Sequence, residues 1–291
     1  MSRKDQKRET GFLFEPEQIT EVFKKIRQQN GLIHMIPNTV SASLCAHGLA
    51  ALGARPLMAV APEEMAEILE QADACVINLG QLNQEKLSAA NLALQWGKDL
   101  QKPIVLDPVG CGASTFRMQA AEKLLKLSWR GIIKGNQSEL YSIQQKELTK
   151  EGIDSRKNRC LSDKIQPGRV YLATGREDCV LWEGQKLEMP HRKKIVHNIL
   201  GTGCLLGAVT GACYCAAAEK SEREGALPKE AEETGTDHMV LAAAAASRGM
   251  EYALEQAGKQ SGYGGAVTAL LDGLEELSEK KFLDWLKGDL K

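Results

Sequence analysis

The sequence predicts an α/β fold with a mainly parallel central sheet, an antiparallel hairpin at one edge and helices on both faces. Apolar runs of strand length alternate with segments of helix length from residue 15 to residue 146. This order is typical of parallel sheets built from right-handed crossovers. Runs such as ADACVINLG (72–80) are continuously apolar, which indicates strands covered on both faces. The order changes at 169–190, where two strands and short turns predict the hairpin.

The first half of the chain supplies the parallel strands. Its first helix covers residues 15–29, where apolar residues recur at spacings of three and four and line one face. The strands expected after it are LIHMIPN (32–38), PLMAVA (56–61), ADACVINLG (72–80), PIVLDPVG (103–110) and GIIKGN (131–136). The helices expected among them cover residues 39–53, 62–72, 83–100, 116–128 and 137–146.

The second half is expected to be helical after the hairpin. We expect helices at 204–219, 238–258 and 264–279, with an exposed polar loop at 222–236. Residues 1–14 are expected to form a flexible tail, and residues 15–291 a single domain.

Composition favours a soluble protein of a reducing compartment. The formal net charge is −1, so no strong field attracts nucleic acid or an anionic membrane. No apolar run is long enough to cross a bilayer, and the N-terminal residues include no apolar signal-peptide core. The eight cysteines follow no disulfide framework spacing. We therefore expect a cytoplasmic protein without nucleic-acid or membrane partners.

Several conspicuous residues have simple structural interpretations. The basic run His191–Lys194 is expected to be a solvated loop or hairpin. Cys213 and Cys215 are expected to be small buried side chains, because a zinc site needs four ligands and no matching pair is near. His34 precedes a strand end and is expected to be structural.

Asp107 follows an apolar strand in IVLDPVGCGAS and precedes a glycine-rich turn. Ligands of open α/β sheets bind at the carboxyl ends of the strands, where Asp107 is expected to lie. There its carboxylate is suited to hold Mg²⁺, directly or through water. The alternative is a side chain that only caps its own turn. Spacing alone does not choose between them.

The segment KGNQSE contributes two charged residues at the next strand end. Lys134 follows the strand, and Glu139 lies in the first turn of the following helix. Lys134 is suited to neutralise polyphosphate charge, and Glu139 to bind metal-coordinated water. Alternatively, Ser138 and Glu139 only cap the helix.

The segment GTGC (201–204) places successive backbone N–H groups at the start of an apolar helix. A helix N-terminus of this kind is a ready-made anion site. The segment has neither the spacing of a Walker A loop nor that of a GxGxxG fingerprint. A glycine-rich helix start without a ligand is the alternative.

Seven motifs together show a resemblance to a known family: IHMIPNTV, ALGARPLMA, INLGQL, VLDPVGCGAS, KGNQSE, LATG and GTGCLLGAVTGA. Their order is that of hydroxyethylthiazole kinases, ribokinase-like enzymes of thiamin salvage, and the resemblance covers residues 17–279. It implies ATP-dependent phosphorylation of the primary alcohol of 4-methyl-5-(2-hydroxyethyl)thiazole. It also implies Mg²⁺ and a homotrimer whose thiazole sites lie between subunits.

The resemblance assigns roles by motif position. It implies thiazole contacts for Asn38, Met58 and Gly201. It implies ATP contacts for Lys134, Asn136, Thr174 and Gly203. It places Asp107 and Glu139 in the Mg²⁺–phosphate region and Cys204 at the catalytic position.

The sequence departs from the family pattern without losing a catalytic group. Lys134 stands where the family usually has Arg, and Leu200 where it has Thr before GTGC. IPN replaces ITN at 36–38, and GYGGA at 262–266 replaces GPGSF. We expect Cys204 to accept the proton of the alcohol, as an Asp does in related enzymes, without forming a phospho-enzyme.

Other functions stay open at this point. One is a kinase of another small heterocyclic alcohol, such as hydroxymethylpyrimidine or a pyridoxal-like compound. Another is a nucleotide-dependent NAD(P)H-hydrate dehydratase on the same fold, although such enzymes normally carry Asp at the position of Cys204. A third is a sensor that binds thiazole or nucleotide without turnover.

Overall fold

The fold is organised around one eight-stranded sheet. The computed structural model describes residues 14–148, 161–163, 165–191, 199–218 and 231–288, with only the backbone of 231–235. The strands lie in the order β2-β1-β3-β4-β5-β6-β7-β8. They are β1 (Leu32–Ile36), β2 (Arg55–Leu57), β3 (Ala74–Asn78), β4 (Ile104–Asp107), β5 (Gly131–Asn136), β6 (Arg169–Thr174), β7 (Glu177–Trp182) and β8 (Gln185–Pro190). The first six are parallel, and β7 and β8 continue the sheet antiparallel.

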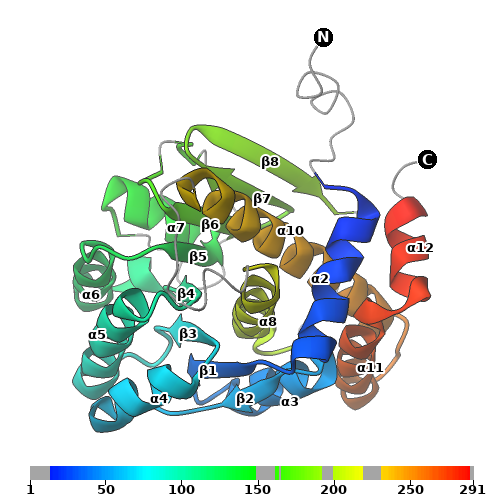
Figure 1. Ribbon diagram of the computed structural model, residues 1–291, viewed down its shortest axis with the longest axis horizontal. Coiled ribbons are helices and arrows are strands. Elements are labelled where there is room, and N and C mark those ends of the chain that lie inside the picture. The colour runs from blue at the N-terminus through cyan, green and yellow to red at the C-terminus, as the bar shows by residue number, and fades with distance from the viewer. Residues whose placement is uncertain (1–13, 149–160, 164, 192–198, 219–230, 289–291) are drawn as a thin grey trace.

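Helices cover both faces of the sheet (Figure 1). On one face lie α4 (Met65–Gln71), α5 (Gln84–Asp99), α6 (Thr115–Leu125) and α7 (Gln137–Gln145). On the other lie α2 (Pro16–Gln29), α3 (Ala42–Leu52), α8 (Thr202–Ala217), α10 (Ala231–Ala257), α11 (Tyr263–Glu275) and α12 (Lys280–Gly288). Short 3₁₀ turns occur at η1 (Pro62–Glu64), η2 (Cys111–Ala113) and η4 (Glu276–Ser278).

The predicted fold class is confirmed, including the mainly parallel sheet, the antiparallel edge and the helices on both faces. Strands β1, β3, β4 and β5 are fully or almost fully buried, as their continuous apolar runs predicted. The central helix α8 is buried on nearly every side, because it packs against the sheet on one side and against α2, α3 and α10 on others.

The largest differences from the prediction concern two element boundaries and two additional elements. Strand β2 ends at Leu57, because it lies at the sheet edge and pairs with β1 over only three residues. The hairpin has a third strand, β8, whose side chains are mostly exposed and therefore carry a weak apolar signal. Helix α10 begins at Ala231, inside the expected loop. An additional helix, α12, follows an extended Glu279 and buries Phe282 and Leu286.

Parts of three other predictions lie outside the described residues. These parts are residues 1–13 of the expected tail, Arg192–Lys194 of the basic run, and residues 222–230 of the expected loop. Phe14, expected to belong to the tail, packs against the core. His191, expected to be solvated, instead lies between Asp178 and Glu251.

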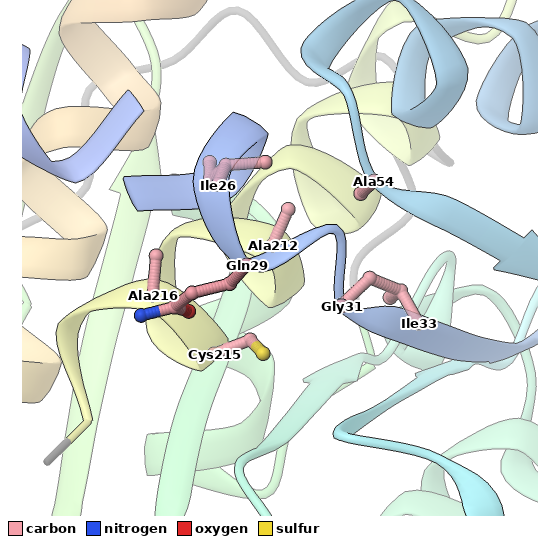
Figure 2. A pocket seen from close by; sticks show the side chains of 8 residues that line it. All are labelled: Ile26, Gln29, Gly31, Ile33, Ala54, Ala212, Cys215 and Ala216. Carbon is pink, nitrogen blue, oxygen red and sulfur yellow. The ribbon is translucent and has the colours of Figure 1, made fainter. Parts of the chain in front are cut away.

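A small apolar cavity lies at the amino ends of the strands, away from the edge where ligands of this fold class bind. Figure 2 shows that its lining comes from α2, the start of β1, the last turns of α8, and Ala54, which directly precedes β2. The lining residues are Ile26, Gln29, Gly31, Ile33, Ala54, Ala212, Cys215 and Ala216. Its volume of about 10 Å³ is that of roughly one water molecule, so it is a packing defect rather than a substrate site.

Candidate active site

Two neighbouring strands place Asn78 and Asp107 side by side at the carboxyl edge of the sheet. The residues are partners in the β3–β4 register, and the amide of Asn78 donates to Asp107 Oδ2 over 2.9 Å. Lys134 comes from the next strand, β5, and its Nζ lies 3.4 Å from the same oxygen. All three side chains are buried. The convergence of Asp107 and Lys134 that the strand ends predicted is therefore present.

Glu139 completes this group of charges and also caps α7. One carboxylate oxygen accepts from the backbone N–H of Gly110 over 2.7 Å, and the other from that of Asn136 over 2.8 Å. The Asn136 side chain accepts in turn from the Glu139 N–H, which makes a capping box. Glu139 therefore caps the helix, as the alternative interpretation predicted, whereas the Ser138 hydroxyl has no hydrogen-bond partner among the described residues. We call Asp107, Lys134 and Glu139 the parallel-edge cluster.

The parallel-edge cluster has one ammonium group for two carboxyl groups. Burial raises the pKa of Asp107, while Lys134 and Asn78 oppose the rise. Burial acts to lower the pKa of Lys134, but Asp107 and Glu139 outweigh it and raise that pKa. Burial, and then repulsion from Asp107, raise the pKa of Glu139 to about 7. The cluster therefore has two carboxyl groups whose ionisation burial opposes, and one ammonium group to compensate them.

The start of α8 lies directly over the parallel-edge cluster. A Cβ atom added to Gly203 would lie 3.5 Å from Lys134 Nζ, and one added to Gly207 would lie 3.3 Å from Asp107 Oδ2. Gly201, the N-cap residue of the helix, has a left-handed φ of 88°, and a Cβ atom there would meet Ser41 at 2.7 Å. Glycine is required at Gly201 for both reasons, conformation and contact with α3.

Cys204 lies in the first turn of α8 and is almost fully buried. The side-chain amide of Asn38, which follows β1, points to Cys204 Sγ at a donor–acceptor distance of 4.0 Å. Asn38 also packs against Gly80, where an added Cβ atom would lie 2.5 Å from its amide nitrogen. The two predicted residues are thus neighbours. Met58 follows β2 and is partly buried against the apolar core that includes Cys204.

Thr174 ends β6 beside the end of β5. It is the register partner of Asn136, and its hydroxyl lies 3.5 Å from the carbonyl oxygen of Gly135. The following Gly175 packs closely on Gln137, the first residue of α7. The predicted nucleotide contacts Lys134, Asn136 and Thr174 therefore share one edge of two neighbouring strands.

Comparison with known proteins identifies the family. The sequence profile described as the hydroxyethylthiazole kinase family matches residues 23–280. The chain belongs to the hydroxyethylthiazole kinase family. It is therefore a kinase, an enzyme that transfers a phosphoryl group.

Hydroxyethylthiazole kinases from several organisms are similar to the chain. One from Exiguobacterium sp. is 38% identical over 199 residues, which are 66% of this chain and 76% of that protein. One from Vibrio campbellii is 31% identical over 280 residues, which are 93% of this chain and 97% of that protein.

Solved structures agree with the family and the fold. A hydroxyethylthiazole kinase protein from Pyrococcus horikoshii has a TM-score of 0.72 and 28% identity over 90% of this chain and 94% of that one. A ribokinase-like superfamily protein from Enterococcus faecalis has a TM-score of 0.52 at 12% identity over 87% of this chain and 89% of that one. The chain therefore has a ribokinase-like fold.

Three residues at the edge that holds these motifs were not assigned roles from the sequence. Asn78 bridges β3 to Asp107. Arg117 donates to the carbonyl oxygens of Leu79 and Val109. These two hydrogen bonds connect the segments that follow β3 and β4. Lys86 is buried in the first turn of α5. The position of Asn78 at the end of an apolar strand could have indicated a site residue. Lys86 and Arg117 could not be recognised in this way, because a lysine or arginine at the start of a helix normally has a solvated side chain.

The described residues contain neither a cluster of three metal-ligating side chains nor a membrane-spanning helix. In the described part of the chain, no three His, Cys, Asp or Glu side chains gather closely enough to hold a metal ion. No helix among the described residues has the length and apolar character needed to cross a bilayer.

Proposed function

We propose that this edge of the sheet transfers the γ-phosphoryl group of ATP to the primary alcohol of 4-methyl-5-(2-hydroxyethyl)thiazole, a step of thiamin salvage. The relatives named above are hydroxyethylthiazole kinases, which supports the substrate. The observation that carries the proposal is the meeting of the α8 N-terminus with the parallel-edge cluster, because it joins amide donors to a cation and two carboxyl groups.

The amides at the start of α8 are suited to hold the transferring group. Phosphoryl transfer needs alignment and charge stabilisation more than covalent help from the protein. The N–H groups of Thr202, Gly203 and Cys204 have no partner inside the helix, and the helix dipole favours an anion there. We assign Lys134, Asn136, Thr174 and Gly203 to ATP, with Lys134 beside the phosphates.

The parallel-edge cluster fits a magnesium ion held mainly through water and phosphate oxygens. Mg²⁺ usually takes one or two carboxylates together with substrate phosphates rather than a full cage of side chains. Asp107 and Glu139 offer carboxylate oxygens, and a bound cation would offset the cost of ionising these two buried groups. When bound, Mg²⁺ supplies positive charge to the triphosphate.

Cys204 is assigned the role of proton acceptor for the alcohol. It lies in the first turn of α8, next to the amides that would hold the phosphoryl group, and Asn38 flanks its sulfur. A base in this position removes the proton as the new O–P bond forms, and the bond between the γ-phosphorus and the bridging oxygen of ADP breaks. No covalent bond to sulfur is needed.

We assign the thiazole to the region of Asn38, Met58 and Gly201. We also propose that the enzyme is a homotrimer in which these sites lie between subunits. Large apolar side chains are exposed around this region, which supports an interface there. They are Val40, Val60, Leu200 and Tyr263. The Tyr263 hydroxyl accepts from the Leu200 N–H over 3.2 Å, so the altered GYGGA segment contacts the residue before GTGC.

We also infer a cytoplasmic location, because all seven described cysteines are free, as expected in a reducing compartment. Nothing in the net charge of −1 favours a nucleic-acid partner.

The deciding experiment is product analysis. Purified protein is incubated with ATP, Mg²⁺ and the thiazole alcohol, and the mass of the product is measured. The expected product is the phosphate monoester of the thiazole. Parallel incubations with hydroxymethylpyrimidine and pyridoxal test the other kinases, and conversion of hydrated NADH to NADH tests the dehydratase. Faster turnover of any of these than of the thiazole would overturn the proposal.

A further inference from the structure

Lys86 is a buried lysine whose charge has no carboxylate partner among the described residues. It lies in the first turn of α5 and is 7% exposed. Its Nζ donates to the carbonyl oxygen of Gly80 over 2.5 Å. The ion pairs of the described residues include none with Lys86. Burial without a counter-ion is costly for an ammonium group, because it loses hydration without recovering it from an anion.

The surroundings of Lys86 explain its protonation. Burial lowers the pKa of its ammonium group to about 8; Cys204 opposes the shift, and the positive Arg117 adds to it. Near neutral pH the group is therefore still mainly charged. Gly80, whose carbonyl oxygen accepts from Lys86, packs against Asn38, and the Asn38 amide lies 4.0 Å from Cys204 Sγ. Lys86 therefore lies near the start of α8, where the phosphoryl group is proposed to move.

A row of hydrogen bonds connects Lys86 to the parallel-edge cluster. The carbonyl of Gly80 accepts from Lys86, and the N–H of Gly80 donates to Asn78 over 2.9 Å. Asn78 donates to Asp107, which pairs with Lys134. The two lysines therefore stand at opposite ends of one row of hydrogen bonds.

A purely structural role does not require the charge. A neutral donor, such as the amide of glutamine, would satisfy the Gly80 carbonyl without the cost of a buried ammonium. A positive charge is favoured there only when an anion is present. The group proposed to bind beside Cys204 is such an anion.

We propose that Lys86 is a phosphate-binding residue of this site, which contacts the terminal phosphate of the bound nucleotide and then the phosphate of the product. The inference rests on the proposed function of the α8 N-terminus. It gives the site a second ammonium group, at the other end of the hydrogen-bonded row from Lys134. Unlike Lys134, this ammonium has no carboxylate partner in the part of the chain that the structure describes.

The test compares Lys86→Met, Lys86→Gln and Lys86→Arg with the wild type. The matched control is Lys98→Met, which removes the same charge from an exposed position of α5. Binding of inorganic triphosphate with Mg²⁺ is measured by calorimetry, so this result does not depend on the acceptor alcohol. We expect Lys86→Met and Lys86→Gln to bind about tenfold more weakly or worse, and Lys86→Arg to retain most of the affinity. The control should equal the wild type.

The pH profile of kcat/KM for ATP separates charge from packing. In the wild type it should fall as the pH rises through about 8, because Lys86 loses its proton. Lys86→Arg should extend the profile to higher pH, since arginine stays charged. Lys86→Gln retains a donor for Gly80, so its loss of binding cannot be assigned to that hydrogen bond.

Unchanged triphosphate binding in folded Lys86→Gln would overturn the inference, whatever alcohol is phosphorylated. A pH profile of Lys86→Arg that superimposes on the wild type would also overturn it. Failure to phosphorylate the thiazole, with the binding differences intact, would instead count against the proposed substrate and leave the role of Lys86 supported.

Discussion

Two largely buried groups of charged side chains in the described part of the chain invite comparison, one at the carboxyl ends of the central strands and one beside the antiparallel hairpin. One is the parallel-edge cluster, and the other, the hairpin cluster, consists of Asp178, His191, Arg248 and Glu251. In the hairpin cluster His191 lies 3.3 Å from Asp178, and Arg248 lies 2.7 Å from Glu251. Hydrogen bonds and charge from the two carboxylates raise the pKa of His191 to about 10, so it is a cation at neutral pH.

The difference lies in how the charges are matched. The groups of the hairpin cluster named here are two cations and two anions, and Asp178 also accepts from Ser247 and from the Gly175 N–H. The parallel-edge cluster has one cation for two carboxyl groups. A matched cluster needs no ligand, whereas an unmatched one is improved by a cation. We therefore expect the hairpin cluster to support stability and the parallel-edge cluster to support activity.

The largest effect is expected beside the parallel-edge cluster, at Cys204. Cys204→Ala should lower kcat about 10²–10⁴-fold, because the alcohol loses its proton acceptor. Cys204→Asp should remain active, since a carboxylate also accepts a proton. Steady-state kinetics of both variants provide the measurement. A phosphocysteine trapped during turnover of the wild type would contradict the assigned role.

A pair of matched substitutions tests the comparison directly. Asp107→Asn should lower kcat about a hundredfold or more, because the Mg²⁺ that neutralises the triphosphate loses one of its carboxylates. The same variant should have a thermal stability that is nearly unchanged or higher. Asp178→Asn should destabilise the fold by about 3 kcal/mol, because a buried cation loses its partner, and should retain activity when folded. Denaturant unfolding and kinetics on both variants decide. The reverse pattern would refute the division between the clusters.

The Mg²⁺ concentration that the reaction requires should depend on the ionisation of Glu139 in the parallel-edge cluster. The pKa of Glu139 is raised to about 7, so its carboxyl group loses a proton as the pH rises from 6 to 8. The free Mg²⁺ concentration for half-maximal rate should therefore fall severalfold over that range. Glu139→Gln should remove most of this dependence. Identical Mg²⁺ requirements of the wild type at pH 6 and pH 8 would count against the assigned magnesium site.

The smallest effect concerns the pH dependence of stability. The folded-state pKa of His191, about 10, lies above its ordinary value of 6.5. Its contribution is therefore complete below about pH 6.5, declines above it and is lost as the pH rises through about 10. His191→Gln should unfold with a shallower decline of stability between pH 7 and pH 10. Parallel curves for the two proteins would show that His191 is not the group responsible.

Much of the site was predictable because carboxyl ends of parallel strands meet at one edge. Asp107 and Lys134 were brought together by this rule, and strand β5 has the predicted bounds. The place of Cys204 beside them came from the family resemblance, because it follows a helix start rather than a strand. The Asn78–Asp107 bond depends on the register of β3 and β4, which sequence pattern does not contain. Lys86 was missed because burial of a helix-start lysine depends on the loop before it. Strand β8 was missed because an exposed edge strand has little apolar pattern.

The contact between the Asn38 amide and Cys204 Sγ joins positions 166 apart in the chain. Such a pair forms only after the strands of the first half and the central helix of the second have docked. Nascent chains released before that helix emerges would consequently lack the transfer centre, however well their strands had paired. Catalytic competence should thus appear late in refolding and report completion of the whole architecture.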